Sequence, residues 1–440
     1  MTRTDGKAND EIFRLFQSVG RASLVVDMQD SHSGNMSVKF KDEQGREHIA
    51  ITSTGSQKGD LDPSQVCTMP VTETDFGYYK ASSEAATHAG ILNLPGVGAA
   101  IHVHAKDLTI VTMDDSPKPS SPPAFIPLDP LGFYHLGGRI PVLWVSVPSG
   151  SRELTEKSLA ALADHPAAVI QTHGVFTKAR TLKEAFFLAH IANASGTVVR
   201  LAEKLGVDLA GLRTRLGNDP GSQFDGRPEA FSLEPDDRCD FPDEGAIRRE
   251  FVKTGARIFE SRISPFQTGS ISVRGAREML YAPKASMPRE IGGPLLKVPL
   301  EPGESDSSEV RRHKAIYAGS DFQTILHCYV PEAEAQALAL HPGPDEPFGR
   351  IISIDAEGSF LYLVIPVVPP RTETETLIRL LHDYKMVVVR GGGVWAVGRQ
   401  SLSEVLHHPS SLRDICLYRI GVVERGLDVK KMEPPQAKRW

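Results

Sequence analysis

The chain has 440 residues, a formal net charge of −6, and 40% hydrophobic and 24% charged residues. This composition is typical of a globular protein and excludes a fibrous or disordered chain. The negative charge argues against nucleic acid or an anionic membrane as the main partner. Because 440 residues exceed one ordinary hydrophobic core, we expect two domains.

The sequence features that bear on localisation favour the cytoplasm. The first ten residues, M-T-R-T-D-G-K-A-N-D, lack the apolar core of a signal peptide, and no apolar run approaches the length of a membrane span. The four cysteines are far apart and form no CxxC pair: Cys67, Cys239, Cys328 and Cys416. We therefore expect a reduced, cytoplasmic protein without a membrane partner.

The first elements combine one helix with a strand pair. Apolar residues at helical spacing predict an amphipathic helix within residues 11–26. Strands at 36–40 and 48–52 follow, joined by a polar turn. The loop at 53–59 is built of small residues, which can turn backbone amides toward an anion but also form ordinary turns.

Residues 82–104 contain several of the candidate functional residues of the chain. Ser82 and Ser83 predict a helix N-terminus, because serine oxygens accept hydrogen bonds from first-turn amides. Glu84 follows where the helix dipole favours negative charge, and His88 shares its helix face. Pro95-Gly96 ends the helix before the next strand.

Three histidines are candidate metal ligands. In the strand predicted at 98–105, His102 and His104 point to the same face, which makes half of a metal site. On spacing alone, a partly exposed strand face is the more frequent arrangement of such a pair. His173 ends a later apolar strand and precedes Gly174, which permits a sharp turn, so His173 is a plausible third ligand.

The remainder of the first half is interpreted as scaffold. Residues 116–123 are proline-rich and predict a surface loop. A strand at 141–147, a helix at 153–163 and a long helix at 182–201 follow. Residues 206–244 are rich in Gly, Pro and Asp and weakly periodic, which predicts a linker.

The second half repeats the first. Residues 16–20 and 33–39 recur 235 positions later, whereas Ser82-Ser83-Glu84, His88 and His102 recur 225 positions later. The strand before the third histidine recurs at 386–391, which predicts an offset of 217. Blocks with small changes of offset between them indicate a duplicated domain with loop insertions and deletions.

The copy has lost its histidine triad. His327 remains, but Tyr329 stands at the second position, and the offset of 217 puts Arg390 at the third. Ser307, Ser308 and Arg390 are candidates for an anion site in this half; a purely structural copy is the alternative. The run of glycines after Arg390 predicts a tight turn, because it lacks the lysine and spacing of a P-loop.

These residues carry a resemblance to the class II aldolase/adducin family, nearest its L-fuculose 1-phosphate aldolase branch. The resemblance covers roughly residues 12–205 and rests on these ordered landmarks: Gly34-Asn35-Met36-Ser37, Thr52-Ser53-Thr54-Gly55, Ser82-Ser83-Glu84, His88, His102-Val103-His104, Ser151-Arg152-Glu153-Leu154, His173-Gly174 and the helix at 182–201. It implies an α/β chain of two tandem domains, each a central, mostly antiparallel sheet flanked by helices. The expected boundaries are 1–205, a linker at 206–245, and a degenerate domain at 246–440.

The resemblance also implies a reaction. It identifies the chain as a metal-dependent aldolase that cleaves a small phosphorylated ketose, or a related hydroxy-carbonyl acid, through a metal-stabilised enediolate. The triad would hold Zn²⁺ or another divalent metal such as Mn²⁺ or Co²⁺, and Glu84 would exchange the proton at the carbanion carbon. The positions that match the family's phosphate-binding residues are Asn35, Thr54, Gly55, Ser82 and Ser83.

Two other functions are compatible with the same fold. Sugar-phosphate 4-epimerases share the fold but usually carry Asp where Glu84 stands, and a non-enzymatic adducin-like module would have degraded ligands.

The family's catalytic tyrosine has no clear counterpart, since Leu131 occupies the matching position and Tyr134 lies three residues later. Because family sites lie between neighbouring subunits of a fourfold ring, we expect a homodimer with four-domain pseudo-symmetry.

Overall fold

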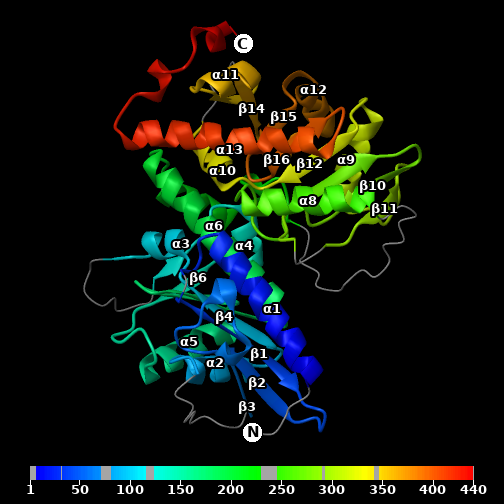
Figure 1. The fold of residues 1–440 in the computed structure, drawn as a ribbon. Helices are drawn as coiled ribbons and strands as arrows, with labels where there is room; N and C mark the ends of the chain where they lie inside the picture. The colour runs from blue at the N-terminus through cyan, green and yellow to red at the C-terminus, as the bar shows by residue number, and fades with distance from the viewer. Residues whose placement is uncertain are drawn as a thin grey trace. The chain divides into compact units, whose positions relative to one another are not determined.

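The computed structural model divides into two compact units, each described separately here (Figure 1). The first unit comprises Met1–Pro127 and Leu131–Gly196, and the second comprises Leu128–Pro130 and Thr197–Trp440. The structure describes residues 6–30, 32–70, 81–114, 123–228, 245–289, 293–340 and 346–439.

The first unit is built on an eight-stranded sheet in the order β3-β2-β1-β4-β8-β7-β6-β5. Its strands are β1 (Asn35–Lys41), β2 (Glu47–Thr52), β3 (Val66–Pro70), β4 (Ala99–Val103), β5 (Ala124–Phe125), β6 (Ile140–Leu143), β7 (Ala167–Ile170) and β8 (Gly174–Ala179). Every neighbouring pair is antiparallel except β6 and β7, which are parallel. The predicted mostly antiparallel sheet is confirmed.

Helices flank this sheet. They are α1 (Gly6–Val25), α2 (Ala85–Leu92), α3 (Lys106–Val111), α4 (Pro130–His135), α5 (Arg152–Asp164) and α6 (Leu182–Lys204), of which α4 begins and α6 ends in residues assigned to the second unit. Helices α2 and α5 share one buried cluster with the sheet residue Phe176, and they lie side by side in Figure 1. On α1, a Cβ at Gly20 would lie 2.0 Å from the carbonyl oxygen of Lys58. Glycine therefore lets α1 press directly on the short helix η1 (Lys58–Asp60).

The second unit repeats this topology, with the strand order β11-β10-β9-β12-β16-β15-β14-β13. Its strands are β9 (Ser270–Arg274), β10 (Glu278–Ala282), β11 (Leu296–Pro299), β12 (Thr324–Cys328), β13 (Gly349–Ile352), β14 (Val364–Val368), β15 (Met386–Val389) and β16 (Gly393–Gly398). Its helices include α7 (Leu209–Asn218), α8 (Ala246–Glu260), α9 (Ser308–Ala318), α10 (Pro331–Ala339), α11 (Ala356–Leu361), α12 (Thr374–Tyr384) and α13 (Leu402–Glu424). The pair β14–β15 is parallel, as β6–β7 is in the first unit. The predicted tandem fold is confirmed.

Two local expectations differ from the structure. Helix α2 begins at Ala85 with Glu84 as its N-cap, so the paired serines form the preceding turn rather than the first helical turn. The segment interpreted as a linker contains α7, which buries Leu212 and Leu216. Only two apolar residues face the core in ten, so the helical period was too weak to detect. Residues 115–122 and 229–244, which include most of the predicted proline-rich loop, lie outside the described residues.

The hairpin register corrects the predicted alignment of the two halves. Ile170 pairs with Gly174 in β7–β8, and Val389 pairs with Gly393 in β15–β16, an offset of 219. The residue that matches His173 is therefore Gly392, and the prediction that Arg390 holds the third ligand's position was wrong. The three consecutive glycines allow the sequence to be shifted by two residues without disturbing its apolar pattern, so only the hydrogen-bonded register distinguishes the alternatives.

Helix α6 is the one described helix with the length and mean hydropathy of a membrane span. The apolar window within it is 78% buried in the protein. The core helix of a globular domain meets the same criteria, so α6 is weak support for a membrane segment.

Candidate metal and proton-transfer site

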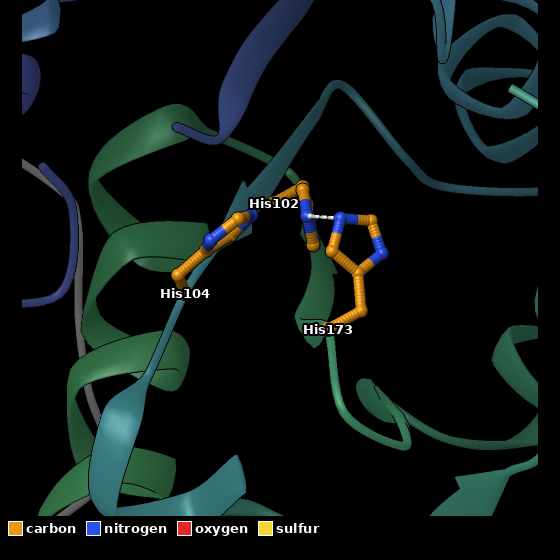
Figure 2. A group of neighbouring side chains, drawn as sticks. All are labelled: His102, His104 and His173. Carbon is orange, nitrogen blue, oxygen red and sulfur yellow. Dashed lines mark hydrogen bonds between the residues drawn. The ribbon is translucent and has the colours of Figure 1, made fainter. Parts of the chain in front are cut away.

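The three predicted metal ligands converge in the first unit. His102 lies on β4, His104 directly follows that strand, and His173 lies in the β7–β8 turn. One ring nitrogen from each lies within 4.8 Å of the other two. Figure 2 shows the three rings close together, with ring centres 4.5 to 5.2 Å apart, and the Nε2 atoms of His102 and His173 are 3.3 Å apart. Among the described residues this is the one cluster of three such ligands.

The local backbone brings His173 to this place. Thr172 adopts a left-handed conformation (φ +61°), and the amide of His173 donates to the carbonyl of Ile170 at 3.0 Å. A Cβ on Gly174 would lie 2.4 Å from the carbonyl oxygen of Val103. Glycine after the histidine therefore allows the turn to close against β4, whereas the left-handed residue of the sharp turn is Thr172 rather than Gly174.

The imidazoles are held neutral by burial. Burial and the neighbouring imidazoles place the pKa of His102 well below its usual value, and burial lowers the pKa of His173 to about 4. The Nδ1 of His102 donates to the carbonyl of Val175 at 3.2 Å, which leaves a lone pair on Nε2. Neutral imidazoles with lone pairs directed at one another suit a divalent cation, so these residues fit a metal site.

Glu84 completes the group. Its carboxylate oxygens lie 3.9 Å from His102 Nε2 and 3.7 Å from His173 Nε2, and the residue is 2% exposed. Burial raises the pKa of Glu84 to about 7, while a hydrogen bond from Asn35 and the charge of Lys58 act in the opposite direction. A buried carboxyl group with this pKa can both accept and release a proton near neutral pH.

A buried histidine orients the amide beside Glu84. The Nε2 of His88 donates to the Oδ1 of Asn35, so in the neutral ring its Nδ1 accepts from the hydroxyl of Ser37 at 2.7 Å. Since the amide oxygen of Asn35 is engaged in this way, its Nδ2 donates to Glu84 Oε2 at 2.7 Å and to Ser82 Oγ at 3.0 Å. Burial lowers the pKa of His88 to about 3, so this ring is a neutral positioning group.

The predicted anion-binding residues also meet at the start of α2. Thr54 Oγ1 accepts from the amide of Ser83 at 3.1 Å and donates to the carbonyl of Ala81 at 2.9 Å. Gly55 follows with φ +69°. These bonds join the small-residue loop to the paired serines, and the Asn35–Ser82 bond links both to the strand β1.

Sequence reasoning missed the buried cation Lys58 of the first unit. Lys58 is 1% exposed, and its Nζ donates to the carbonyls of His32 (2.6 Å) and Ser56 (3.1 Å). Burial lowers its pKa to about 8. A lysine in a polar loop is normally exposed, so the sequence contained no signal for this role. Gln29, which donates to the carbonyl of His102 at 3.4 Å, was missed for the same reason.

In the second unit, the histidine that matches His102 is fully engaged in hydrogen bonds. His327 Nδ1 bonds Glu309 Oε1 at 2.6 Å, and its Nε2 bonds the carbonyl of Gly392 at 2.8 Å. Burial raises the pKa of Tyr329 well above its usual value, so its phenol stays protonated. Both ring nitrogens of the remaining histidine are engaged, and no triad is present around it among the described residues.

Arg390 does not complete the predicted anion site. Its Nε and Nη2 donate to the carbonyls of Ala337 (3.1 Å) and Leu340 (2.7 Å) at the end of α10. Ser307 caps α9 by accepting from the amide of Val310 at 3.1 Å. Arg390 therefore stabilises a helix C-terminus.

Comparison with known proteins identifies the family. The sequence profile described as Class II Aldolase and Adducin N-terminal domain matches residues 11–196 and 249–419. The chain belongs to this family, with one copy of the domain in each half. It is similar to the 5-methylthioribulose-1-phosphate/5-deoxyribulose-1-phosphate aldolase of Rhodospirillum rubrum, with 30% identity over 174 residues that cover 38% of this chain and 71% of the relative.

Solved structures of single-domain length also match. L-fuculose-1-phosphate aldolase from Thermus thermophilus is 24% identical with a TM-score of 0.39, covering 44% of this chain and 95% of its own. A sugar-phosphate aldolase from Thermotoga maritima is 21% identical with a TM-score of 0.37, covering 45% of this chain and 97% of its own. The fold assignment rests on the family match and on the two sheets.

Proposed function

We propose that this protein is a metal-dependent aldolase that cleaves a small phosphorylated ketose, or a related hydroxy-carbonyl acid, at a site in the first unit. The observation that carries the proposal is the convergence of three neutral imidazoles with Glu84 3.7 to 3.9 Å from two of them. The similar R. rubrum protein is named as an aldolase of phosphorylated ribulose derivatives. An intact triad also disfavours a purely non-enzymatic role.

The triad prepares the site for charge stabilisation. His102, His104 and His173 would hold Zn²⁺, Mn²⁺ or Co²⁺ through neutral ring nitrogens, so the cation would keep its full charge. When bound, such a cation stabilises the negative charge that develops on substrate oxygens as the carbon–carbon bond breaks.

Glu84 moves the proton that the reaction requires. When the aldehyde fragment leaves, the electron pair of the broken bond remains on the other fragment, whose carbon must gain a proton. In this proposal a protonated Oε of Glu84 delivers that proton, and the substrate hydroxyl that becomes the aldehyde carbonyl releases its own proton to water, from which the carboxyl group is protonated again. In the reverse direction the carboxylate takes the proton back from the carbon. Asn35, oriented by His88, fixes the carboxyl group through its 2.7 Å bond to Oε2.

The paired serines and the adjoining loop bind the phosphate in this proposal. The Ser83 hydroxyl and the loop amides at Thr54 and Gly55 are the proposed donors in front of α2, where the helix dipole favours an anion. The Ser82 and Thr54 side chains hold this turn and loop in place through their own hydrogen bonds. Lys58 adds a positive charge to the neighbouring loop from its buried position.

The test combines metal analysis with product analysis. Purified protein should contain about one divalent metal per chain and release an aldehyde from a phosphorylated ketose. His104→Ala should lose both the metal and the cleavage, whereas the matched variant His327→Ala should keep both because its ring nitrogens are engaged by Glu309 and Gly392. An epimerised ketose as the product would replace the aldolase assignment, and metal retained in His104→Ala would contradict the site.

A further inference from the structure

In the second unit, the position of the lost third ligand is occupied by another part of the chain. Gly392 matches His173 in the hairpin register. A Cβ on Gly392 would lie 2.6 Å from the Cβ of Asp225. The segment that follows α7 therefore fills the space into which a side chain at this position would project.

This segment, residues 223–225, is anchored by several bonds within the second unit. The Asp225 amide donates to the carbonyl of Gly391 at 3.1 Å. The Asp225 carboxylate accepts from Arg312 Nη1 at 2.5 Å and from the Arg371 amide at 2.7 Å. Phe224 beside it is 1% exposed, so both an apolar ring and a charge hold the segment in place.

The glycines at this turn serve the close approach of the segment. Gly391 has φ +60°, but Thr172 adopts φ +61° at the matching position, so the turn itself does not require glycine. A Cβ on Gly391 would instead lie 2.4 Å from the carbonyl oxygen of Gln223 and 2.8 Å from Phe224 Cδ1. Because neither glycine has a side chain, residues 223–225 can pack directly against this turn.

The positive charge that faces Asp225 comes from Arg312, which has no charged counterpart in the first unit. Arg312 stands where the first unit has Thr87, 225 positions earlier. Its guanidinium carbon lies 5.3 Å from the centre of the Trp395 ring, a position that favours a cation. The Arg312 and Asp225 side chains are only 21% and 11% exposed, so a cation and a backbone amide face one partly buried carboxylate.

We propose that Arg312 and the Arg371 amide form an anion-binding pocket whose occupant is the chain's own Asp225 carboxylate. With that carboxylate in place, this pocket is closed to free anions; without it, the pocket accepts a small free anion. A guanidinium and a backbone amide directed at one point suit carboxylate or phosphate oxygens. This inference goes beyond the proposed aldolase activity and does not depend on it.

The experiment measures binding of inorganic phosphate to the full chain by isothermal titration calorimetry. Asp225→Ala should bind one more phosphate per chain than the wild type, because the carboxylate no longer neutralises Arg312. Adding Arg312→Met to Asp225→Ala should weaken this extra binding by about tenfold or more, the usual effect of losing a charged hydrogen-bond donor. Any phosphate bound by the first unit is common to all variants and cancels in the comparison.

Two further variants make the result decisive. Asp219→Ala removes the same charge at an exposed position before the anchored segment and should bind no extra phosphate. Phe224→Ala/Asp225→Ala releases the segment fully, in case Phe224 alone keeps the pocket closed. No extra phosphate in either Asp225 variant would overturn the proposal, as would extra binding that persists with Arg312→Met or appears in Asp219→Ala.

Discussion

The two units share a sheet order and a glutamate at the same place, yet the glutamates have opposite surroundings. Burial raises the pKa of Glu84 to about 7, and its carboxylate lies 3.7 Å or more from the imidazoles. Burial acts the same way on Glu309, but His327, 2.6 Å away, and further hydrogen bonds lower its pKa to about 2. A buried carboxyl group beside neutral imidazoles can exchange protons, whereas one hydrogen-bonded directly to a histidine becomes a fixed charge.

The neighbouring side chain accounts for this difference. In the first unit the amide of Asn35 donates to Glu84, and His88 fixes the orientation of that amide. In the second unit Ser270 takes the place of Asn35; its hydroxyl donates to Glu309, which also bonds His327. The duplicated sheet thus supports either arrangement, and a few side chains decide between a reactive and a structural site.

The largest expected effect comes from removing each glutamate in turn. Glu84→Gln should lower kcat by about 10²–10⁴, the usual contribution of a general acid–base group, without loss of metal. Glu309→Gln should leave kcat near the wild-type value, because its carboxylate serves the internal bond to His327. Steady-state kinetics and metal analysis of both variants test this contrast; equal turnover in Glu84→Gln and wild type would remove Glu84 from the mechanism.

A second contrast lies in how the glutamates couple stability to pH in metal-free protein. The pKa of Glu309 is lowered from 4.5 to about 2, so its stabilisation is present above pH 4.5 and is lost as pH falls toward 2. The pKa of Glu84 is raised from 4.5 to about 7, so its folded form binds the proton more tightly and its contribution to stability falls as pH rises through that interval.

Thermal unfolding at several pH values checks both signs. The difference in Tm between wild type and Glu309→Gln should shrink below pH 4.5, and the difference between wild type and Glu84→Gln should change in the opposite sense between pH 4.5 and 7. Each effect is on the order of a few kcal/mol, since one pKa unit corresponds to about 1.4 kcal/mol. If the Tm difference from wild type changed with pH in the same direction for both variants, the contrast between the two glutamates would be wrong.

The smallest expected effect concerns the paired serines. Ser83→Ala should raise KM for a phosphorylated substrate by about tenfold, the cost of one hydrogen bond to a charged group, and should affect a neutral analogue less. Ser308, the matching serine of the second unit, is the control, and Ser308→Ala should leave both KM values unchanged. An equal rise of KM for both substrates in Ser83→Ala would refute the anion assignment.

Much of the site could be predicted from local pattern. Strand alternation places His102 and His104 on one face, and a histidine before a glycine marks the end of a strand, so the triad was recognisable before its geometry was known. The duplication was visible because Ser307-Ser308-Glu309 preserves the order of Ser82-Ser83-Glu84. These features depend on neighbours in the sequence, and their spacing survives in the fold.

The remaining features depend on partners distant in sequence. Lys58 and Phe224 lie in polar, weakly periodic segments, and only tertiary contacts bury them. The choice between Arg390 and Gly392 required the hydrogen-bonded pairing of two strands. The sequence by itself determined the tandem family fold and the histidine triad, because both follow from local order and spacing. The tertiary structure alone decided that Glu84 lies buried 3.7 to 3.9 Å from two imidazoles and that Asp225 fills the space beside Gly392, because burial and charge pairing arise only when distant segments meet.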